Sequence, residues 1–187
     1  MTITFLFLLV FSYFVGSIPF GLLFGRIFAD VDVREFGSGN IGATNVNRVL
    51  GRKLGALTLL CDSLKGLIPT LVAAFLLQSQ LDAAWIGISA FLGHIFPIYL
   101  RFQGGKGVAT MFGVLFALSL PSGLIGLMTW LAGVKISKIS SVGALTACAV
   151  IPVAVFLFEG SWPHVRDYMR ARGIIAASSS SSGSGLG

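Results

Sequence analysis

Long apolar runs alternate with short polar segments along this 187-residue chain. Clear apolar runs cover residues 5–24, 54–77, 83–100 and 142–158. A run of about 20 apolar residues is long enough to cross the hydrocarbon core of a bilayer as a helix. The pattern therefore predicts an all-α fold, a polytopic transmembrane helical bundle with short and broken helices.

The apolar segment at residues 108–133 allows two topologies. It is either one long span or a helical hairpin that turns at Pro121-Ser122-Gly123. A single span places Lys135 and Lys138 outside and the three arginines of residues 166–172 inside, and a hairpin reverses both. Positive charge favours the cytoplasmic side, so charge counting alone slightly favours the single span, by three bases against two.

Polar residues interrupt the second apolar run. Asp62, Lys65 and Gly66 lie inside it, and Pro69 follows. Its middle is therefore either a break in the helix or the wall of a polar cavity. On a helix, Asp62 and Lys65 share one face, where they form either a structural ion pair that holds the loops or a contact to substrate.

Composition confirms that water is not the main solvent, since 55% of residues are hydrophobic, 11% are charged, and the mean hydropathy is +0.91. The net charge of +6 lies between the apolar runs, which indicates membrane orientation and anionic headgroups rather than nucleic acid. The basic segments at residues 30–53 and 101–107 should share the cytoplasmic side, with the N-terminus and the acidic connector 78–82 outside. We expect residues 30–53 to form an irregular loop at the membrane face.

The strongest chemical signal is the first glycine-rich segment, residues 37–48. It reads Gly37-Ser38-Gly39-Asn40-Ile41-Gly42-Ala43-Thr44-Asn45-Val46-Asn47-Arg48. Its glycines permit positive φ angles, so that successive N–H groups can converge on an anion. Ser38, Thr44 and the asparagines add neutral donors, and Arg48 adds a forked charge. This composition predicts phosphate binding.

The same segment matches the dinucleotide fingerprint G-x-G-x-x-G at Gly37, Gly39 and Gly42. That fingerprint requires a preceding β-strand within a βαβ unit. Here a membrane span precedes the motif and an apolar helix follows it, so we reject the dinucleotide interpretation.

The second glycine-rich loop is Gly104-Gly105-Lys106-Gly107, followed by Thr110. It offers backbone donors and one ammonium at a predicted helix N-terminus, where the helix dipole favours an anion. It is not a Walker A loop, because Gly107 rather than Ser or Thr follows Lys106. His94 lies within about three helical turns of Lys106 and either satisfies a neighbouring helix or contacts substrate.

The sequence contains no recognisable Ser-His-Asp set, paired carboxylates or His/Cys metal cluster. We therefore expect no metal and no cofactor. The predicted site positions anions at the lipid interface, which suits a reaction whose substrate brings its own leaving group. A transporter or anion channel is a second possibility, because broken helices and a buried ion pair also suit a translocation path. A non-catalytic membrane scaffold is a third.

In these motifs the chain resembles the bacterial acyl-phosphate:glycerol-3-phosphate acyltransferases of the PlsY type. The matching residues are Gly37-Ser38-Gly39-Asn40, Gly42-Ala43-Thr44-Asn45 with Arg48, Asp62-x-x-Lys65-Gly66, Gly93-His94-x-Phe96-Pro97 and Gly104-Gly105-Lys106-Gly107-Val108-Ala109-Thr110. The resemblance implies a multi-pass enzyme of the bacterial cytoplasmic (inner) membrane. It would transfer a fatty acyl group from acyl phosphate to the 1-hydroxyl of glycerol 3-phosphate and form lysophosphatidic acid and phosphate. The family's seven or so spans favour the hairpin, which gives about six spans here.

The resemblance and the anion-binding pattern together assign the site. Ser38 and Arg48 resemble the family's essential residues and are the expected catalytic pair. The expected substrate-binding residues are Gly37, Gly39, Asn40, Thr44, Asn45, Lys65, His94, Gly104, Gly105, Lys106, Gly107 and Thr110. Expected partners are glycerol 3-phosphate, acyl phosphate, membrane lipid and the enzyme that forms acyl phosphate. We hypothesise that a substrate phosphate oxygen accepts the hydroxyl proton.

The resemblance weakens towards the C-terminus. The family continues with another span and a third motif containing His, Asn and Glu, whereas here Gly173-Ile174-Ile175 passes into a serine run. We therefore expect a membrane domain at residues 1–175 and a low-complexity Ser/Gly tail at 176–187. His164 does not take the role of the third motif, so part of the family's site would be absent.

Overall fold

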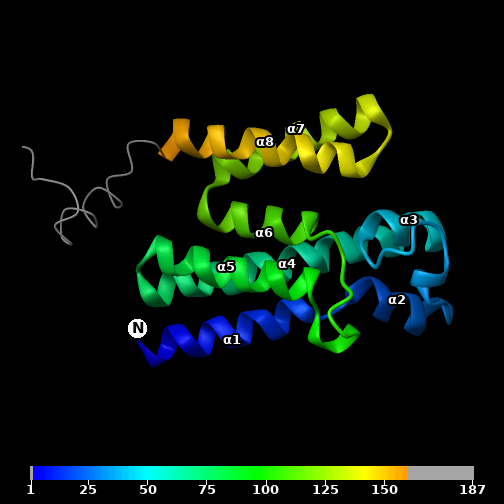
Figure 1. The fold of residues 1–187 in the computed structure, drawn as a ribbon, viewed down its shortest axis with the longest axis horizontal. Helices are drawn as coiled ribbons and strands as arrows, with labels where there is room; N and C mark the ends of the chain where they lie inside the picture. The colour runs from blue at the N-terminus through cyan, green and yellow to red at the C-terminus, as the bar shows by residue number, and fades with distance from the viewer. Residues whose placement is uncertain (1, 160–187) are drawn as a thin grey trace, which may run out of the picture.

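The computed structural model describes residues 2–159, and every regular element in this range is helical (Figure 1). In chain order the elements are α1 (Ile3–Ser17), α2 (Phe20–Ala29), η1 (Val33–Glu35), α3 (Ala43–Leu50), α4 (Arg52–Leu77), α5 (Gln80–Ile95), η2 (Ile98–Leu100), α6 (Val108–Leu118), α7 (Leu120–Ser137) and α8 (Ser140–Glu159). The all-α prediction is confirmed. The predicted Ser/Gly tail, the boundary after residue 175, and the arginines at 166–172 lie outside the described residues.

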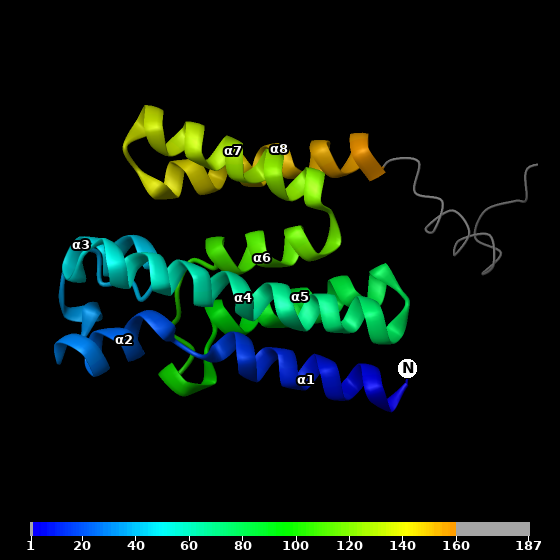
Figure 2. The same cartoon turned by 180° about the vertical axis from the view of Figure 1, so that it is seen from behind.

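The long helices lie roughly side by side in layers. Figures 1 and 2 show α1 at one edge, α4 and α5 next to it, then α6, and the α7–α8 hairpin at the other edge. The main packing pairs are α1 with α5, α4 with both α5 and α6, and α7 with α8. Short helices α2 and α3 lie at the same end of the bundle as the second glycine-rich loop and the α7–α8 turn. The N-terminus and the α4–α5 turn lie at the opposite end (Figure 1).

The outer surfaces of these helices are apolar. Large side chains such as Phe75 and Leu145 are 81% and 71% exposed, as expected for helices that face lipid rather than water. Helix α4, the segment Gln80–Leu100 and α7 are long and apolar enough to cross a membrane, and the α1–α2 pair counts as a fourth candidate if it is one span. The other predicted spans correspond to the shorter apolar helix α6 and the apolar part of α8, Ser140–Val155.

The first predicted span is broken. Helix α1 ends at Ser17, α2 begins at Phe20, and the two axes differ by 40°. Proline has no N–H to continue the helical ladder, and it forces the preceding residue away from helical angles. Ile18 accordingly adopts the extended angles φ −63° and ψ 118° before Pro19. The predicted span at residues 5–24 therefore consists of two helices, in agreement with the expectation of short and broken helices.

The second predicted span is continuous. Helix α4 runs without a break through Asp62, Lys65, Gly66 and Pro69, and all four residues are buried. The alternative of a broken helix is therefore wrong. The polar pair is accommodated because it faces the interior of the bundle rather than lipid.

The segment at residues 108–133 is a hairpin, so the single-span alternative is wrong. Helix α6 ends at Leu118, and Ser119 caps the start of α7 by accepting a hydrogen bond from the N–H of Ser122 at 3.4 Å. Pro121 lies in the first turn of α7 rather than in the turn itself, a position where its missing N–H costs little. The hairpin returns the C-terminal end of α7 to the end of the bundle where α3 lies (Figure 1), and Lys135 in the last turn and Lys138 at the C-cap belong to that end of α7.

The segment predicted to be irregular contains a helix. Helix α3 occupies part of residues 30–53 and packs on α4. A small apolar cluster beneath it contains Leu22, Val33, Ile41 and Val46, all buried. This cluster holds the first glycine-rich segment against α2.

Candidate functional site

The first glycine-rich segment forms a turn before α3. Gly37 and Gly39 have φ values of +61° and +69°, as the positive-φ prediction requires. Asn45, which is 1% exposed, braces this turn from below. Its Oδ1 accepts from the N–H of Ser38 at 2.8 Å, and its Nδ2 donates to the carbonyls of Val33 and Phe36 at 2.8 and 3.1 Å.

Three N–H groups of this segment already have hydrogen-bond partners in the protein. Besides the N–H of Ser38, that of Gly39 donates to the carbonyl of Phe36 at 3.0 Å, and that of Gly42 donates to Oδ1 of Asn40 at 2.9 Å. The prediction that successive N–H groups converge on an anion is therefore wrong for these three donors. The side chains of Ser38, Thr44 and Arg48 remain exposed for a ligand.

An ion-pair cluster precedes the segment. Asp32 accepts from Arg34 through Oδ1 at 2.9 Å and through Oδ2 at 2.6 Å, and from Arg26 at 3.1 Å. The hydrogen bond from the Arg34 guanidinium lowers the pKa of the Asp32 carboxyl well below its ordinary value, and the same bond raises the pKa of Arg34. The cluster links the end of α2 to the start of the first glycine-rich segment.

The second glycine-rich loop folds back on the end of α5. The N–H groups of Gly104 and Gly105 donate to the carbonyls of Ile95 and His94, each at 3.1 Å. These two N–H groups are therefore not free for an anion, contrary to the prediction. Gly107 has φ +75° at the N-cap of α6, which confirms the predicted helix start, and the side chain of Lys106 is exposed beside it.

A third polar segment, the α7–α8 turn, joins the two glycine-rich segments. Oγ1 of Thr44 donates to Oγ of Ser140 at 3.4 Å, and the ammonium of Lys106 donates to Oγ of Ser141. Neither serine was predicted from the sequence. Residues 135–141 contain lysines and serines between two apolar segments, and this pattern could have indicated them. It does so only if residues 108–133 form a hairpin, because only then does this turn lie at the same end as the glycine-rich segments.

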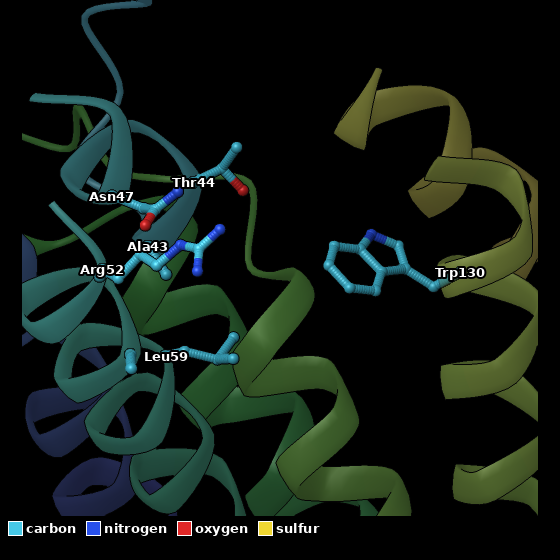
Figure 3. A pocket seen from close by; sticks show the side chains of 8 residues that line it. Ala43, Thr44, Asn47, Arg52, Leu59 and Trp130 are labelled. Carbon is cyan, nitrogen blue, oxygen red and sulfur yellow. The ribbon is translucent and has the colours of Figure 1, made fainter. Parts of the chain in front are cut away.

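A cavity of about 330 Å³ lies between α3, α4 and α7. Thr44, Asn47 and Arg52 provide polar groups on its wall, while Leu59 and Trp130 provide apolar surface. Figure 3 shows the indole of Trp130 reaching from α7 towards these residues. The cavity thus offers both polar and apolar surface next to the first glycine-rich segment.

Three predicted substrate-binding residues lie inside the bundle instead. Lys65 and His94 are 4% and 3% exposed, and Thr110 is fully buried where α6 packs against α4. Nζ of Lys65 lies 2.9 Å from Oδ1 of Asp62, which confirms the predicted ion pair. The remaining predicted residues, those of the two glycine-rich segments, meet at one end of the molecule.

The helical bundle with its polar end defines a multi-pass membrane protein. Within residues 2–159, no cluster of His, Cys, Asp and Glu has a geometry that could hold a metal ion. Comparison with known proteins identifies the family. A family model described as glycerol-3-phosphate acyltransferase matches residues 6–179, so the chain belongs to that family, as the sequence motifs suggested.

Individual relatives agree. A glycerol-3-phosphate acyltransferase of Mesorhizobium japonicum is 49% identical over 159 residues, which are 85% of this chain and 80% of the relative. One of Desulfotalea psychrophila is 51% identical over 154 residues, which are 80% of this chain and 78% of the relative. The crystal structure of PlsY (YgiH), an integral membrane glycerol 3-phosphate acyltransferase, in its glycerol 3-phosphate form matches with a TM-score of 0.75 and 40% identity, over 86% of this chain and 78% of that one. Its lysophosphatidic acid form gives a TM-score of 0.76 at 40% identity, over 82% and 76%.

Proposed function

We propose that this acyltransferase moves a fatty acyl group from acyl phosphate to the 1-hydroxyl of sn-glycerol 3-phosphate, in phospholipid biosynthesis. The observation that carries the proposal is the meeting of the two glycine-rich segments through Thr44, Lys106 and the α7–α8 turn. Two substrates that each bear a phosphate need two anion-binding groups close together. Family membership supplies the reaction class.

The chemistry requires positioning more than activation. Acyl phosphate is a mixed anhydride, so its phosphate is already a good leaving group. The glycerol hydroxyl oxygen attacks the carbonyl carbon, the bond from that carbon to the phosphate oxygen breaks, and inorganic phosphate leaves. A substrate phosphate oxygen accepts the hydroxyl proton. Holding both reactants in register and neutralising their charge provides the rate enhancement.

The exposed side chains divide this work. Ser38 and Arg48 of the first glycine-rich segment bind the reacting acyl phosphate, and Arg48 offers a forked guanidinium suited to its oxygens. Lys106 of the second glycine-rich loop binds the phosphate of glycerol 3-phosphate as a point charge. Thr44 lies between them. The hydrogen bonds of Asn45, Gly104 and Gly105 hold the two backbones in shape.

The same assignment orients the chain in the bacterial cytoplasmic membrane. The end of the bundle with the glycine-rich segments carries Arg48, Arg52, Lys53, Arg101, Lys106, Lys135 and Lys138, whereas the α4–α5 turn at the opposite end carries Asp82 and no base. By the positive-inside rule the glycine-rich segments face the cytoplasm and the N-terminus lies outside. Glycerol 3-phosphate then reaches the site from the cytoplasm, and the donor arrives from the bilayer or from the enzyme that forms it.

A phosphate-release assay in lipid nanodiscs tests the proposal. Acyl phosphate and glycerol 3-phosphate together should release phosphate and form lysophosphatidic acid, while either substrate alone should not. Acyl-CoA serves as the control donor, and turnover with acyl-CoA alone would overturn the donor assignment. Anion flux across vesicles without any acyl transfer would instead identify a transport protein.

A further inference from the structure

Three ionisable side chains cluster inside the bundle, away from the polar surface. Nζ of Lys65 lies 2.9 Å from Oδ1 of Asp62, and Nδ1 of His94 lies 3.7 Å from the same oxygen. The three side chains are 2%, 3% and 3% exposed. Burying charged groups in a membrane protein is costly, so such a cluster is expected to have a function.

One side of the cluster contacts the break in the first span. Nζ of Lys65 donates to the carbonyl of Ile18 at 2.8 Å and lies 5.8 Å from the centre of the Phe20 ring. The bend between α1 and α2 interrupts the helical ladder at Ile18. The ammonium thus touches the residues on both sides of Pro19 and compensates a backbone group that the bend exposes.

The other side of the cluster contacts the second glycine-rich loop. A Cβ atom built on Gly105 would lie 2.1 Å from Nε2 of His94, so the loop backbone rests directly on the imidazole ring. The N–H of Gly105 also donates to the carbonyl of His94 at 3.1 Å. His94 therefore contacts Gly105 through both its ring and its backbone, and Gly105 directly precedes Lys106.

We propose that Asp62, Lys65 and His94 form a positioning cluster that locks the second glycine-rich loop to the bend between α1 and α2. The cluster spans the bundle from Ile18 to Gly105 through contacts between buried groups. A hydrogen bond from Tyr13 Oη to the carbonyl of Phe96, at 2.6 Å, forms a second link between α1 and the end of α5, which precedes the loop. These contacts fix the position of Lys106 relative to helices α1 and α2.

The geometry separates this role from substrate contact. The Lys65 ammonium already has a carboxylate and a carbonyl as partners, and the side chain is 2% exposed, so its charge is compensated within the bundle. His94 is covered by Gly105 on the side that faces the loop. The three residues act on substrate through the loop backbone, which replaces the substrate-binding role that the sequence suggested for Lys65 and His94.

A double-mutant cycle between His94 and Gly105 tests the proposal, and its kinetic readout rests on the proposed function. Gly105→Ala should raise the KM for glycerol 3-phosphate at least about fivefold with a smaller change in kcat, because the new methyl group pushes the loop off the ring. In the His94→Ala background the same substitution should raise KM less than about twofold, because the ring is gone. An equal rise in both backgrounds would show that Gly105 acts by direct substrate contact and would overturn the proposal.

Gly87→Ala is the matched control. Its Cβ would lie 2.4 Å from Cγ1 of Val114, a comparable clash where α5 packs against α6. It should lower thermal stability and leave the KM for glycerol 3-phosphate unchanged. If Gly87→Ala raises KM as much as Gly105→Ala does, the effect is general destabilisation and the proposal is lost.

Hydrogen–deuterium exchange gives a readout that needs no turnover. Asp62→Asn should speed exchange in the peptide covering residues 101–108, whereas the first glycine-rich segment should exchange as in the wild type. Unchanged exchange at residues 101–108 would refute the positioning role. Absence of phosphate release by the wild type would contradict the proposed function alone, because the exchange experiment would still decide the role of the cluster.

Discussion

The ammonium of Lys106 in the second glycine-rich loop donates a hydrogen bond to the hydroxyl of Ser141 in the first turn of α8. An ammonium has three donors, so this bond leaves two for a ligand. The contact also restrains a long side chain that would otherwise lose considerable rotamer freedom on binding. Ser141 therefore holds the Lys106 ammonium next to Ser140, which accepts a hydrogen bond from Thr44 of the first glycine-rich segment.

Removing the ammonium should weaken acceptor binding. We expect Lys106→Ala to raise the KM for glycerol 3-phosphate about 10- to 100-fold, since a charge-assisted hydrogen bond contributes about 1.5–3 kcal/mol. Ser141→Ala should raise it less, because the charge remains. Steady-state kinetics with varied glycerol 3-phosphate measures both. Lys53→Ala, which removes an exposed lysine near the start of α4, is the control; an unchanged KM in Lys106→Ala would remove the assignment.

Asn45 should matter for stability as well as activity. Asn45→Ala removes one acceptor and two donor contacts that brace the turn, and we expect a loss of about 3 kcal/mol in unfolding free energy. Asn45→Asp keeps the acceptor for the N–H of Ser38 but loses the bonds to the carbonyls of Val33 and Phe36, so it should also destabilise. Thermal unfolding in detergent measures the change. Asn47→Ala, at an exposed position of the same helix, should stay within about 0.5 kcal/mol of the wild type.

The ion-pair cluster around Asp32 predicts a pH dependence of stability. The folded-state pKa of Asp32 lies below its unfolded value of about 3.9, so the unfolded chain binds the proton more tightly. The stabilisation is present above the unfolded pKa and is lost as the pH falls towards the folded pKa. Unfolding temperatures at pH 7 and at about pH 2, below the unfolded pKa, should differ more in the wild type than in Asp32→Asn. The difference should be small because Arg26 and Arg34 are largely exposed, and equal shifts in both proteins would contradict the prediction.

The buried pair in α4 should be more sensitive to the loss of one partner than to the loss of both. Asp62→Leu or Lys65→Leu alone leaves an uncompensated charge and should cost about 3–5 kcal/mol, while the double variant should cost less than either. Unfolding in detergent, monitored by circular dichroism, can compare the three. Single-variant costs that simply add in the double variant would show that the two residues do not stabilise each other.

The proton route can be tested through the pH–rate profile. If a substrate phosphate oxygen accepts the hydroxyl proton, Ser38→Ala should lower kcat/KM at least about tenfold without moving either limb of the profile. Variants of Asp62 and His94 should likewise leave both limbs of the pH–rate profile where they are in the wild type. A limb that shifts when one of these groups is replaced would place the base on the protein.

The sequence predicted the helical class and most of the helices, because the helices that cross a bilayer must be apolar over nearly their whole length. Local breaks in the helices were harder to predict. Pro19 interrupts the first apolar run although hydropathy continues unchanged across it. Conversely, α4 continues through Asp62 and Lys65 because those side chains neutralise each other within the bundle. Hydropathy averages cannot distinguish these two cases, since they depend on backbone geometry and on tertiary contacts.

The composition of the glycine-rich segments identified where the polar residues gather but not how the segments are built. Asn45 was predicted to face a ligand, yet its side chain is buried and bonded to the turn above it. Helix α3 was missed because glycine and asparagine are typical of loops, and it is stabilised by apolar contacts of Val46 underneath. The contribution of Ser140 and Ser141 depends on a hairpin that brings residues far apart in sequence together.

The internal hydrogen bonds of both glycine-rich segments also affect how much conformational entropy is lost when a substrate binds. Backbones that are already held by internal hydrogen bonds need not be ordered when a substrate arrives, so the entropy lost on binding falls mainly on long side chains such as that of Arg48. In the proposed function the phosphates are bound by the exposed cations Arg48 and Lys106, of which Lys106 is already restrained by Ser141. Such a site should load rapidly and lose affinity as ionic strength rises, because its attraction is carried by exposed charge.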